Sequence, residues 1–429
     1  MDKGRDARSQ RVGLRTLLGT LAFASALSGA GAAEREAAGL FSSYKDRLLQ
    51  VRVIDLEAGD KSAVGTAFLV DRDGLIATNF HVISEWVHHP DRYKLESVDR
   101  EGGEGNLEVL DVDVVNDLAL LRGPGTGHRP LVLARTTPEQ GETIYSLGNP
   151  FDLGFTVVPG TYNGVSEESS YRHILFSGSV NPGMSGGPVL DASGRVVGVN
   201  VSTAGNQVSF LVPADALAGM IAAWASTSGP VTDFHGRIRE QLMANQAKMF
   251  DGLISKEWPT KRLGEATVLD EMQPYTKCWG QSSDTDTLFK SATSSCRGEH
   301  SVYLGSGLTT GMIGYQFFWM EADRLSAGRF RSYYQNMFSS FAPDNRATKE
   351  SAGNFVCDES FVEDPAGHID KAALCLRAYR QYAGLYDALY LRGSVDMADR
   401  AFVSHFTLAG VTQDTIARFL QRFQEVVRR

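Results

Sequence analysis

Short apolar stretches recur along residues 49–217, and turn-forming residues separate them. The stretches are rich in valine, isoleucine, leucine and phenylalanine, and breaks such as Asp71-Arg72-Asp73-Gly74 lie between them. Runs of this composition, bounded by such breaks, are typical of β-strands. We expect strands at residues 51–54, 67–70, 75–77, 143–146, 195–201 and 208–212. This part of the chain is therefore predicted to be all-β.

Helical spacing is found at both ends of the chain and after the predicted strands. Leu40, Tyr44 and Leu48 recur at every fourth residue and predict a short helix before the first strand. Two further helices are predicted from the apolar positions Ile238, Leu242, Met249, Leu253 and Ile254, and from Ile416, Phe419, Leu420, Phe423 and Val427. We interpret the Arg428-Arg429 pair after the last helix as a solvated helix end.

A change of composition at residues 225–230 divides the chain in two, because small and helix-breaking residues interrupt the apolar pattern there. Beyond this point, residues 386–391 and 402–408 have the pattern of strands. We therefore predict one domain over residues 34–229 and an α+β domain over residues 232–429. The aromatic run at residues 315–319 is interpreted as core of this second domain.

The segment from Asn181 to Pro188 reads Asn-Pro-Gly-Met-Ser-Gly-Gly-Pro and surrounds one serine, Ser185, with glycines. Glycine lets the backbone approach a reacting group without a Cβ clash. The N–H groups of Gly183 and Ser185 could both point at a carbonyl oxygen that gains negative charge, which is the arrangement of an oxyanion hole. This loop is therefore a candidate carrier of a nucleophile.

A serine hydroxyl needs a base and an orienting carboxylate to become a good nucleophile. Residues 74–82 are expected to form an apolar extended stretch with His81 at its end, and residues 112–121 another with Asp117 inside it. The order along the chain is thus His, Asp, Ser. This order is that of the chymotrypsin arrangement and differs from those of subtilisins and α/β-hydrolases.

Residues 183–187 also satisfy the Gly-x-Ser-x-Gly pattern of an esterase nucleophile elbow. An elbow leads from a strand into a helix, and its acid and histidine follow the serine. Here Pro188-Val189-Leu190 leads through Asp191-Ala192-Ser193-Gly194 into residues 195–199, which is the pattern of a β-hairpin. The elbow is therefore rejected.

Five motifs in order give residues 49–217 a resemblance to trypsin-like serine proteases of the bacterial Do-like, or high-temperature-requirement, type. They are Gly65-Thr66-Ala67-Phe68, Thr78-Asn79-Phe80-His81, Asn116-Asp117-Leu118-Ala119, Leu147-Gly148-Asn149-Pro150-Phe151 and the loop of residues 181–187. The resemblance implies a chymotrypsin-like double β-barrel with the active site in the cleft between the barrels. No PDZ module is recognised after it.

The resemblance also implies roles for single residues. Ser185 would be the nucleophile, His81 the general base and then acid, and Asp117 the acceptor that fixes the histidine tautomer. It favours Asp117 over Asp111 and Asp113, although a simple turn aspartate stays an alternative. These proteases often trimerise, so a homo-oligomer is possible.

The chain departs from the pattern of these proteases at two positions near the serine. Met184 stands where asparagine is common, but that residue contributes mainly its backbone. Ser179, six residues before Ser185, would lie at the base of the primary specificity pocket, where no aspartate is present to select arginine or lysine. We expect cleavage after small or apolar residues.

The first 33 residues resemble a secretory signal peptide. Five basic residues precede an apolar run at residues 17–27, and small residues at 28–33 offer a cleavage site near Ala32 or Ala33. An uncleaved anchor is the alternative, but the run is short for a membrane span. The leader up to Ala32 has a net charge of +3 and the whole chain −9, so the mature chain would carry −12. No basic patch is evident, and we expect no binding to nucleic acid.

All four cysteines lie in the second domain, and none forms a Cys-x-x-Cys pair. In an exported protein this favours disulfides over zinc. Three pairings are possible. We favour Cys278 with Cys296 and Cys357 with Cys375, because both loops then have the same spacing of 18 residues. Each such loop would stabilise the fold by about 3 kcal/mol.

We conclude from the sequence that the chain is an exported serine endopeptidase, periplasmic or secreted, which acts on proteins or peptides through an acyl-enzyme. No cofactor and no metal are expected, since His88, His89 and His405 have no ligand partners at suitable spacing. The alternative is a catalytically silent binding or chaperone protein with the same fold. A further possibility is that the second domain gates the cleft of the first.

Overall fold

The computed structural model describes residues 34–124, 127, 129–166, 171–227, 229–283, 288–299, 301–343, 345–364 and 366–429. The predicted signal peptide, residues 1–33, lies outside this range. Residues 34–44 are helical, as their apolar spacing predicted, and lead through a short 3₁₀ turn, η1 (Lys45–Arg47), into the first strand. No helix of the described residues is long and apolar enough to cross a membrane.

The first sheet has seven antiparallel strands in the order β5-β4-β1-β2-β3-β7-β6. Its inward side chains, such as Val51, Ala67 and Ile76, are fully buried. One helix, α2 (Phe80–His88), follows β3 and packs against β1, β2, β4 and β7. The strands are β1 (Leu48–Asp55), β2 (Asp60–Leu69), β3 (Leu75–Thr78), β4 (Tyr93–Val98), β5 (Glu104–Asn106), β6 (Glu108–Asp113) and β7 (Leu118–Arg122).

The second sheet closes on itself, because β12 pairs with both β9 and β13 in the order β12-β9-β10-β11-β14-β13-β8. Its core contains Ile144, Phe176 and Leu211, all buried. The helix α3 (Ala214–Ala225) follows its last strand. The strands are β8 (Val132–Leu133), β9 (Thr143–Gly148), β10 (Thr156–Val165), β11 (Ile174–Phe176), β12 (Pro188–Leu190), β13 (Arg195–Gly205) and β14 (Val208–Pro213). The predicted all-β, double-barrel, chymotrypsin-like fold is confirmed for this half of the chain.

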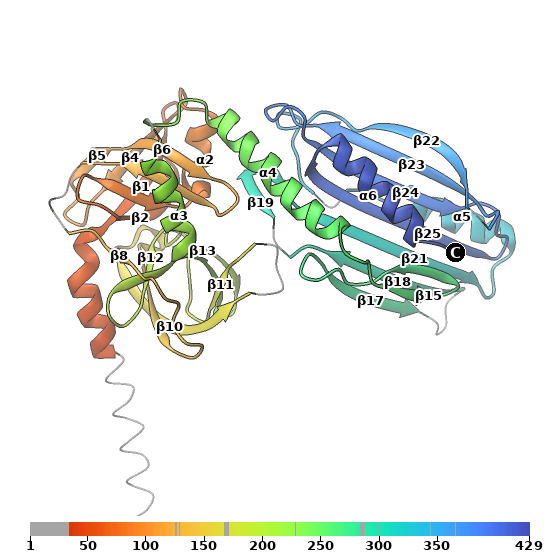
Figure 1. Cartoon of the computed structure of the whole chain (residues 1–429), viewed down its shortest axis with the longest axis horizontal. Helices are drawn as coiled ribbons and strands as arrows, with labels where there is room; N and C mark the ends of the chain where they lie inside the picture. The colour runs from red at the N-terminus through yellow and green to blue at the C-terminus, as the bar shows by residue number, and fades with distance from the viewer. Residues whose placement is uncertain are drawn as a thin grey trace, which may run out of the picture.

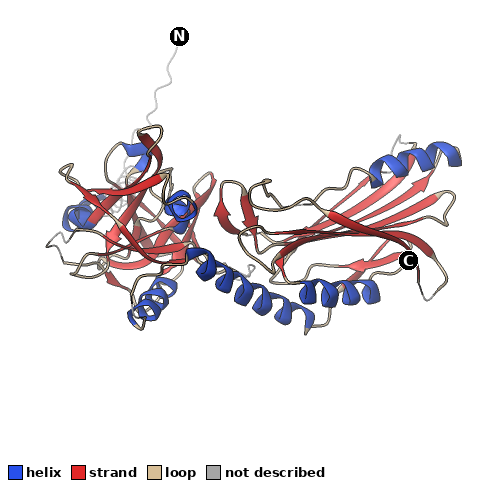
Figure 2. Ribbon diagram, turned by 90° about the horizontal axis from the view of Figure 1, so that it is seen from above, coloured by secondary structure: helices blue, strands red, loops and turns tan. Residues whose placement is uncertain are grey.

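The C-terminal region forms a long antiparallel sheet in the order β17-β18-β21-β25-β24-β23-β22. The helices α4 (Phe234–Ile254) and α6 (Gln413–Val426) cover one face, and α5 (Ala327–Phe338) covers the other (Figure 2). The strands of the sheet are β17 (Lys277–Ser283), β18 (Phe289–Arg297), β21 (Ile313–Ala322), β22 (Val356–Glu363), β23 (Ile369–Ala378), β24 (Tyr386–Ser394) and β25 (Arg400–Val411). Two small hairpins stand apart from it, β15 (Thr260–Leu263) with β16 (Ala266–Leu269) and β19 (Val302–Gly305) with β20 (Leu308–Thr310).

Disulfides join the outermost strand pairs at both edges of this sheet. Cys278 on β17 lies opposite Cys296 on β18, and Cys357 on β22 lies opposite Cys375 on β23. Their sulfur atoms are 1.93 and 2.01 Å apart, so the structure has the two pairs that the equal spacing favoured. Tyr315, Phe317 and Trp319 on β21 are buried, which agrees with their interpretation as core.

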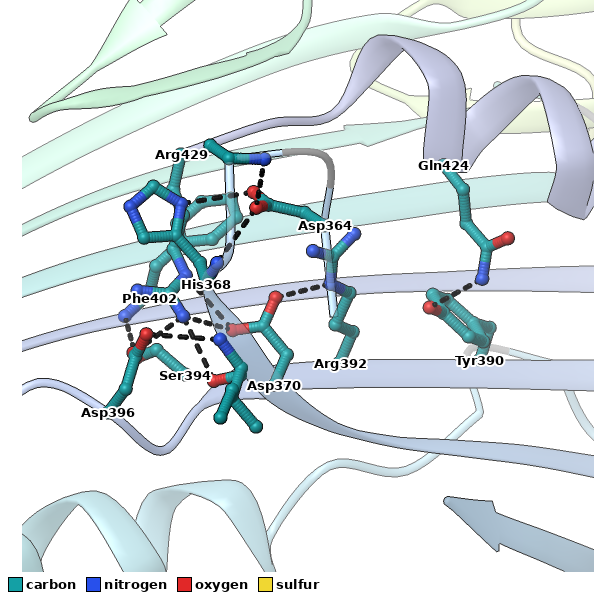
Figure 3. Close-up of polar contacts among 12 residues, drawn as sticks. Asp364, His368, Asp370, Tyr390, Arg392, Ser394, Asp396, Phe402, Gln424 and Arg429 are labelled. Carbon is teal, nitrogen blue, oxygen red and sulfur yellow. Dashed lines mark hydrogen bonds and ion pairs between the residues drawn. The ribbon is translucent and has the colours of Figure 1, made fainter. Parts of the chain in front are cut away.

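The solvated helix end predicted for the last two residues is wrong for Arg429. Its guanidinium bonds to Asp370 at 2.8 Å and to Asp396 at 2.6 Å, and only 2% of its side chain is exposed (Figure 3). Arg392 also pairs with Asp370. The chain turns after α6 and places this arginine against β23, which the charge pattern along the sequence does not reveal. The sheet therefore contains a buried group of two arginines around one carboxylate.

The two halves of the molecule lie side by side (Figure 1), and residues of both form one of the hydrophobic clusters. Ile238 and Leu242 of α4, together with Val302, Leu304 and Leu308 of the β19–β20 hairpin, pack with the buried residues of the first sheet. In addition, Arg237 makes a two-pronged ion pair with the buried Asp111 on β6, at 3.0 Å for both bonds. The C-terminal region is thus joined to the first sheet by buried apolar contacts.

Candidate active site

His81 lies in the first turn of α2, immediately after β3, and not at the end of a strand as predicted. Asn79 starts the helix, and the buried Phe80, Val82 and Ile83 hold it against the first sheet. His81 is left on the other side of the helix with 28% of its side chain exposed. A histidine in this position is fixed by the helix and still reachable from outside.

Asp117 lies in the tight turn between β6 and β7, and the prediction that it is in an extended stretch is wrong. The Asp113 carboxylate accepts hydrogen bonds from the N–H groups of Val115 and Asn116 and so shapes the turn. Asp117 itself has a φ of 54°, a left-handed conformation that few residues other than glycine adopt. The Asn79 side chain donates to its carbonyl at 2.8 Å. The strained turn directs the carboxylate toward α2.

The Asp117 carboxylate contacts His81 at two points. One oxygen accepts from the His81 backbone N–H at 2.8 Å, and the other lies 2.6 Å from Nδ1. Burial disfavours the imidazolium, but the Asp117 charge and hydrogen bond outweigh this effect and raise the pKa of His81 above 6.5. Because Nδ1 is occupied by the carboxylate, Nε2 is the nitrogen left for a substrate or a nucleophile.

The loop that carries Ser185 is bonded directly to strand β2 of the first sheet. The Thr66 N–H donates to the Ser185 carbonyl at 2.8 Å, and the Thr66 hydroxyl donates to the Gly183 carbonyl at 2.7 Å. The same hydroxyl accepts from the Asn149 N–H at 3.0 Å. Thr66 is completely buried. It therefore fixes the serine loop of one barrel to the barrel that carries His81.

Asn200 on β13 supports the same loop from the second barrel. Its side-chain amide donates to the carbonyls of Leu147 and Met184, at 3.2 and 3.3 Å. The backbone carbonyl of Asn200 accepts from the Gly186 N–H at 2.9 Å. The motif around Thr66 was noticed in the sequence, but the role of Asn200 was missed, because no residue pattern distinguishes it from other strand asparagines.

Two glycines of the loop have no possible substitute. Gly186 has a φ of +82°, and a Cβ there would lie 2.2 Å from the Thr78 hydroxyl and 3.0 Å from the Asn79 nitrogen. Gly183 has a φ of +92°, and its Cβ would lie 2.4 Å from the Asn149 carbonyl. The serine loop thus passes directly beside the β3–α2 junction, two residues before His81. The Met184 side chain is buried.

The Ser185 hydroxyl makes one hydrogen bond in the structure, to the Val201 carbonyl at 3.5 Å. Within the described part of the chain, it has no hydrogen bond to His81. The N–H groups of Gly183 and Ser185 likewise have no acceptor among the described residues. A bond of 3.5 Å is weak, so rotation of the hydroxyl away from Val201 costs little.

The remaining candidate residues lie elsewhere. Ser179 is exposed on the segment between β11 and the serine loop. His88 bonds to the Leu304 carbonyl, and His405 is buried within the C-terminal sheet with its pKa lowered by burial to about 4. The described residues contain no cluster of three or more His, Cys, Asp or Glu side chains that could hold a metal ion.

Comparison with known proteins places the match on this part of the chain. Residues 65–199 match the family of trypsin-like peptidase domains. Serine protease HTRA1 of Xenopus laevis is 30% identical over 164 residues, which are 36% of this chain and 34% of that protein. Protease Do-like 5 of Arabidopsis thaliana, a chloroplast protein, is 32% identical over 185 residues, 38% of this chain and 57% of that protein.

Among solved structures, the serine endoprotease of Yersinia pestis is similar with 21% identity and a TM-score of 0.38, over 43% of this chain and 65% of that one. The chain spans about a third of the length of the HTRA1 relatives. The matched family model covers residues 65–199, which lie in the double barrel. Residues 65–199 therefore match a trypsin-like peptidase domain, and the relatives that this chain resembles include serine proteases of the HTRA and Do-like types.

Proposed function

We propose that the chain is an exported serine endopeptidase with Ser185, His81 and Asp117 as its triad. The observation that carries this proposal is the 2.6 Å contact between His81 Nδ1 and Asp117 beside a glycine-framed serine loop. A carboxylate on Nδ1 fixes the tautomer in which Nε2 can accept a proton. The turn that carries Asp117 and the first turn of α2 together hold this contact in place.

In the proposed reaction the Ser185 oxygen attacks the carbonyl carbon of a peptide bond while His81 Nε2 takes the hydroxyl proton. The carbonyl oxygen becomes negative and accepts from the N–H groups of Gly183 and Ser185. His81 then gives its proton to the leaving amine, and the acyl group stays on Ser185. A water molecule repeats the two steps and releases the acid. The hydroxyl must first turn from Val201 toward His81.

A fluorophosphonate probe, which labels activated serines, tests the triad. We expect the wild-type chain to be labelled and the Ser185→Ala variant to be unlabelled. Ser193→Ala is the matched control, because Ser193 is an exposed serine eight residues further on. Equal labelling of the wild type and Ser185→Ala would show that the assignment is wrong.

We further propose that substrates are cleaved after small or apolar residues, since Ser179, six residues before Ser185 in the sequence, carries no negative charge that would select arginine or lysine. A profile dominated by arginine or lysine in a peptide library would contradict this. Export is proposed from the leader pattern and is consistent with two disulfides, which persist in oxidising compartments. Recovery of the chain with an intact leader in the cytosol would contradict export.

A second candidate function is a silent binding or chaperone protein. It is favoured by one observation, the hydrogen bond of Ser185 to Val201 in place of one to His81. Casein digestion separates the two. A peptidase degrades casein and loses this activity in Ser185→Ala, whereas a chaperone leaves casein intact and both forms suppress aggregation equally.

A further inference from the structure

The β19–β20 hairpin belongs to the C-terminal region, but it lies against α2, the helix that carries His81 (Figure 1). Tyr303 on β19 presents its ring to the imidazole of His81. The ring centroids are 6.3 Å apart and the planes are inclined by 85°, an edge-to-face contact. Edge-to-face contacts are a favourable arrangement of two aromatic rings. A residue outside the peptidase domain thus touches the proposed base.

Tyr303 also reaches the backbone of His81 through Ser84. Burial raises the pKa of Tyr303, so its hydroxyl stays protonated, and it shares a hydrogen bond with the Ser84 side chain. The Ser84 hydroxyl in turn donates to the His81 carbonyl at 3.2 Å. Ser84 is buried, with 1% exposed. The ring of Tyr303 therefore contacts the His81 side chain, and its hydroxyl reaches the His81 backbone through Ser84.

The hairpin is anchored to the first barrel on the side of His81. Val302 and Leu304 are buried in the core that it shares with the first sheet. The ring of His88, at the end of α2, bonds through Nε2 to the Leu304 carbonyl. Burial lowers the pKa of His88, so the ring is neutral and Nε2–H is free to donate to this carbonyl. The position of Tyr303 relative to α2 is fixed by these contacts.

The far end of the hairpin is anchored to the second barrel. The Tyr171 hydroxyl, just before β11, donates to the Gly311 carbonyl at 2.8 Å. Asn245 on α4 donates to the same hydroxyl at 3.0 Å. Burial raises the pKa of Tyr171 to about 12, so this hydroxyl keeps its proton. The hairpin is therefore attached to residues of both barrels.

We propose that Tyr303 is a positioning residue for His81, so that the active site is complete only when the C-terminal region is in place. This inference rests on the proposed function. Asp117 holds the Nδ1 side of the imidazole but leaves the ring free to tilt about that contact. The ring of Tyr303 limits this tilt and so keeps Nε2 directed at the position that the serine oxygen takes in the reaction. Displacements of about 1 Å in such a group can lower a rate by about 10²-fold.

The test compares Tyr303→Ala and Tyr303→Phe, with Tyr333→Ala as the matched control. Tyr333 is a tyrosine of the same region, on α5, and is 52% exposed. We expect Tyr303→Ala to lower the rate of fluorophosphonate labelling by about 10- to 100-fold and to shift its pH profile, while the thermal midpoint shows that the chain is folded. Tyr303→Phe, which keeps the ring, should recover most of the rate, and Tyr333→Ala should match the wild type.

Two results would overturn the proposal. If folded Tyr303→Ala has the rate and pH profile of the wild type, Tyr303 does not position His81. If the variant is labelled faster than the wild type, the hairpin obstructs the site. Both results differ from failure of the proposed function, in which the wild-type chain is not labelled at all.

A measurement without turnover keeps the two questions separate. In the Ser185→Ala background, NMR of isotope-labelled histidines follows the ring of His81 with and without Tyr303→Ala. We expect the His81 resonances and their titration midpoint to change when the tyrosine ring is removed, because it covers the imidazole. Unchanged resonances and midpoint would contradict the inference whatever the activity of the chain.

Discussion

Two histidines, one in each half of the molecule, have pKa values that are shifted in opposite directions. His81 in the peptidase domain has its pKa raised, because the Asp117 carboxylate outweighs the cost of burial. His405 on β25 is 2% exposed and has its pKa lowered by burial to about 4. Its Nε2 lies 3.3 Å from the Thr407 hydroxyl, and within the described residues its Nδ1 has no partner.

The comparison shows that burial without a carboxylate partner lowers the pKa of a histidine and keeps its ring neutral. An adjacent carboxylate is needed to keep the charged form accessible near neutral pH, where proton transfer is useful. The C-terminal sheet does have buried carboxylates, but Asp370 is paired with Arg392 and Arg429, whose charges do not titrate. In the proposed function the His81–Asp117 pair moves a proton, whereas the paired charges around Asp370 are expected to have only a structural role.

The largest effect is expected from a substitution that breaks the His81–Asp117 pair. Asp117→Asn keeps the shape of the side chain but removes the charge and permits the wrong tautomer. We expect kcat on a peptide substrate to fall by about 10⁴-fold. The base must be neutral, so wild-type activity should rise with pH through a pKa above 6.5. In the variant, the midpoint of this rise should move to lower pH, and an unchanged midpoint would contradict the role of Asp117.

The second prediction concerns the permanent ion pairs. Arg429→Met removes one of the two arginines that pair with the buried Asp370, as well as an ion pair of the partly exposed Asp396. It should lower the free energy of unfolding by up to about 3 kcal/mol. Urea denaturation measures this. Arg428→Met is the matched control, because Arg428 is exposed. Activity per folded molecule should be unchanged in both variants, and a specific loss of kcat in Arg429→Met would contradict a structural role.

The smallest expected effect concerns His405. Its folded pKa of about 4 lies below its ordinary value of 6.5, so the unfolded chain binds the proton more readily. Stability contributed by the neutral ring is complete above pH 6.5 and is lost as the pH falls toward 4. In His405→Phe the new ring can pack against the neighbouring Phe341. The difference in free energy of unfolding between this variant and the wild type should be about 2 kcal/mol more favourable to the variant at pH 5 than at pH 8.

Urea denaturation at both pH values checks this prediction. An equal difference between variant and wild type at pH 5 and pH 8 would show that His405 does not titrate in the fold. Activity measurements on the same variant sharpen the comparison, since His405 should have no effect on kcat, in contrast to any change at the His81–Asp117 pair.

Much of the peptidase half could be predicted because its motifs are local. The glycines around Ser185 are required by positive φ angles and by close backbone contacts, and such requirements leave a direct mark on the sequence. The helix at His81 and the turn at Asp117 were missed, because both lie within apolar runs that resemble strands. In both places the apolar pattern was misleading. At Asp117, the hydrogen bonds that the Asp113 carboxylate accepts shape the turn.

The sequence by itself determined the strand-rich character of the first half, the order of His, Asp and Ser, and the equal spacing of the four cysteines. These are properties of neighbouring residues, and short-range physics fixes them. Only the tertiary structure decided that Tyr303 meets His81, that Thr66 holds the serine loop, and that Arg429 is buried against Asp370. Each of these contacts joins residues more than 50 positions apart, and their meeting depends on the packing of whole sheets against one another.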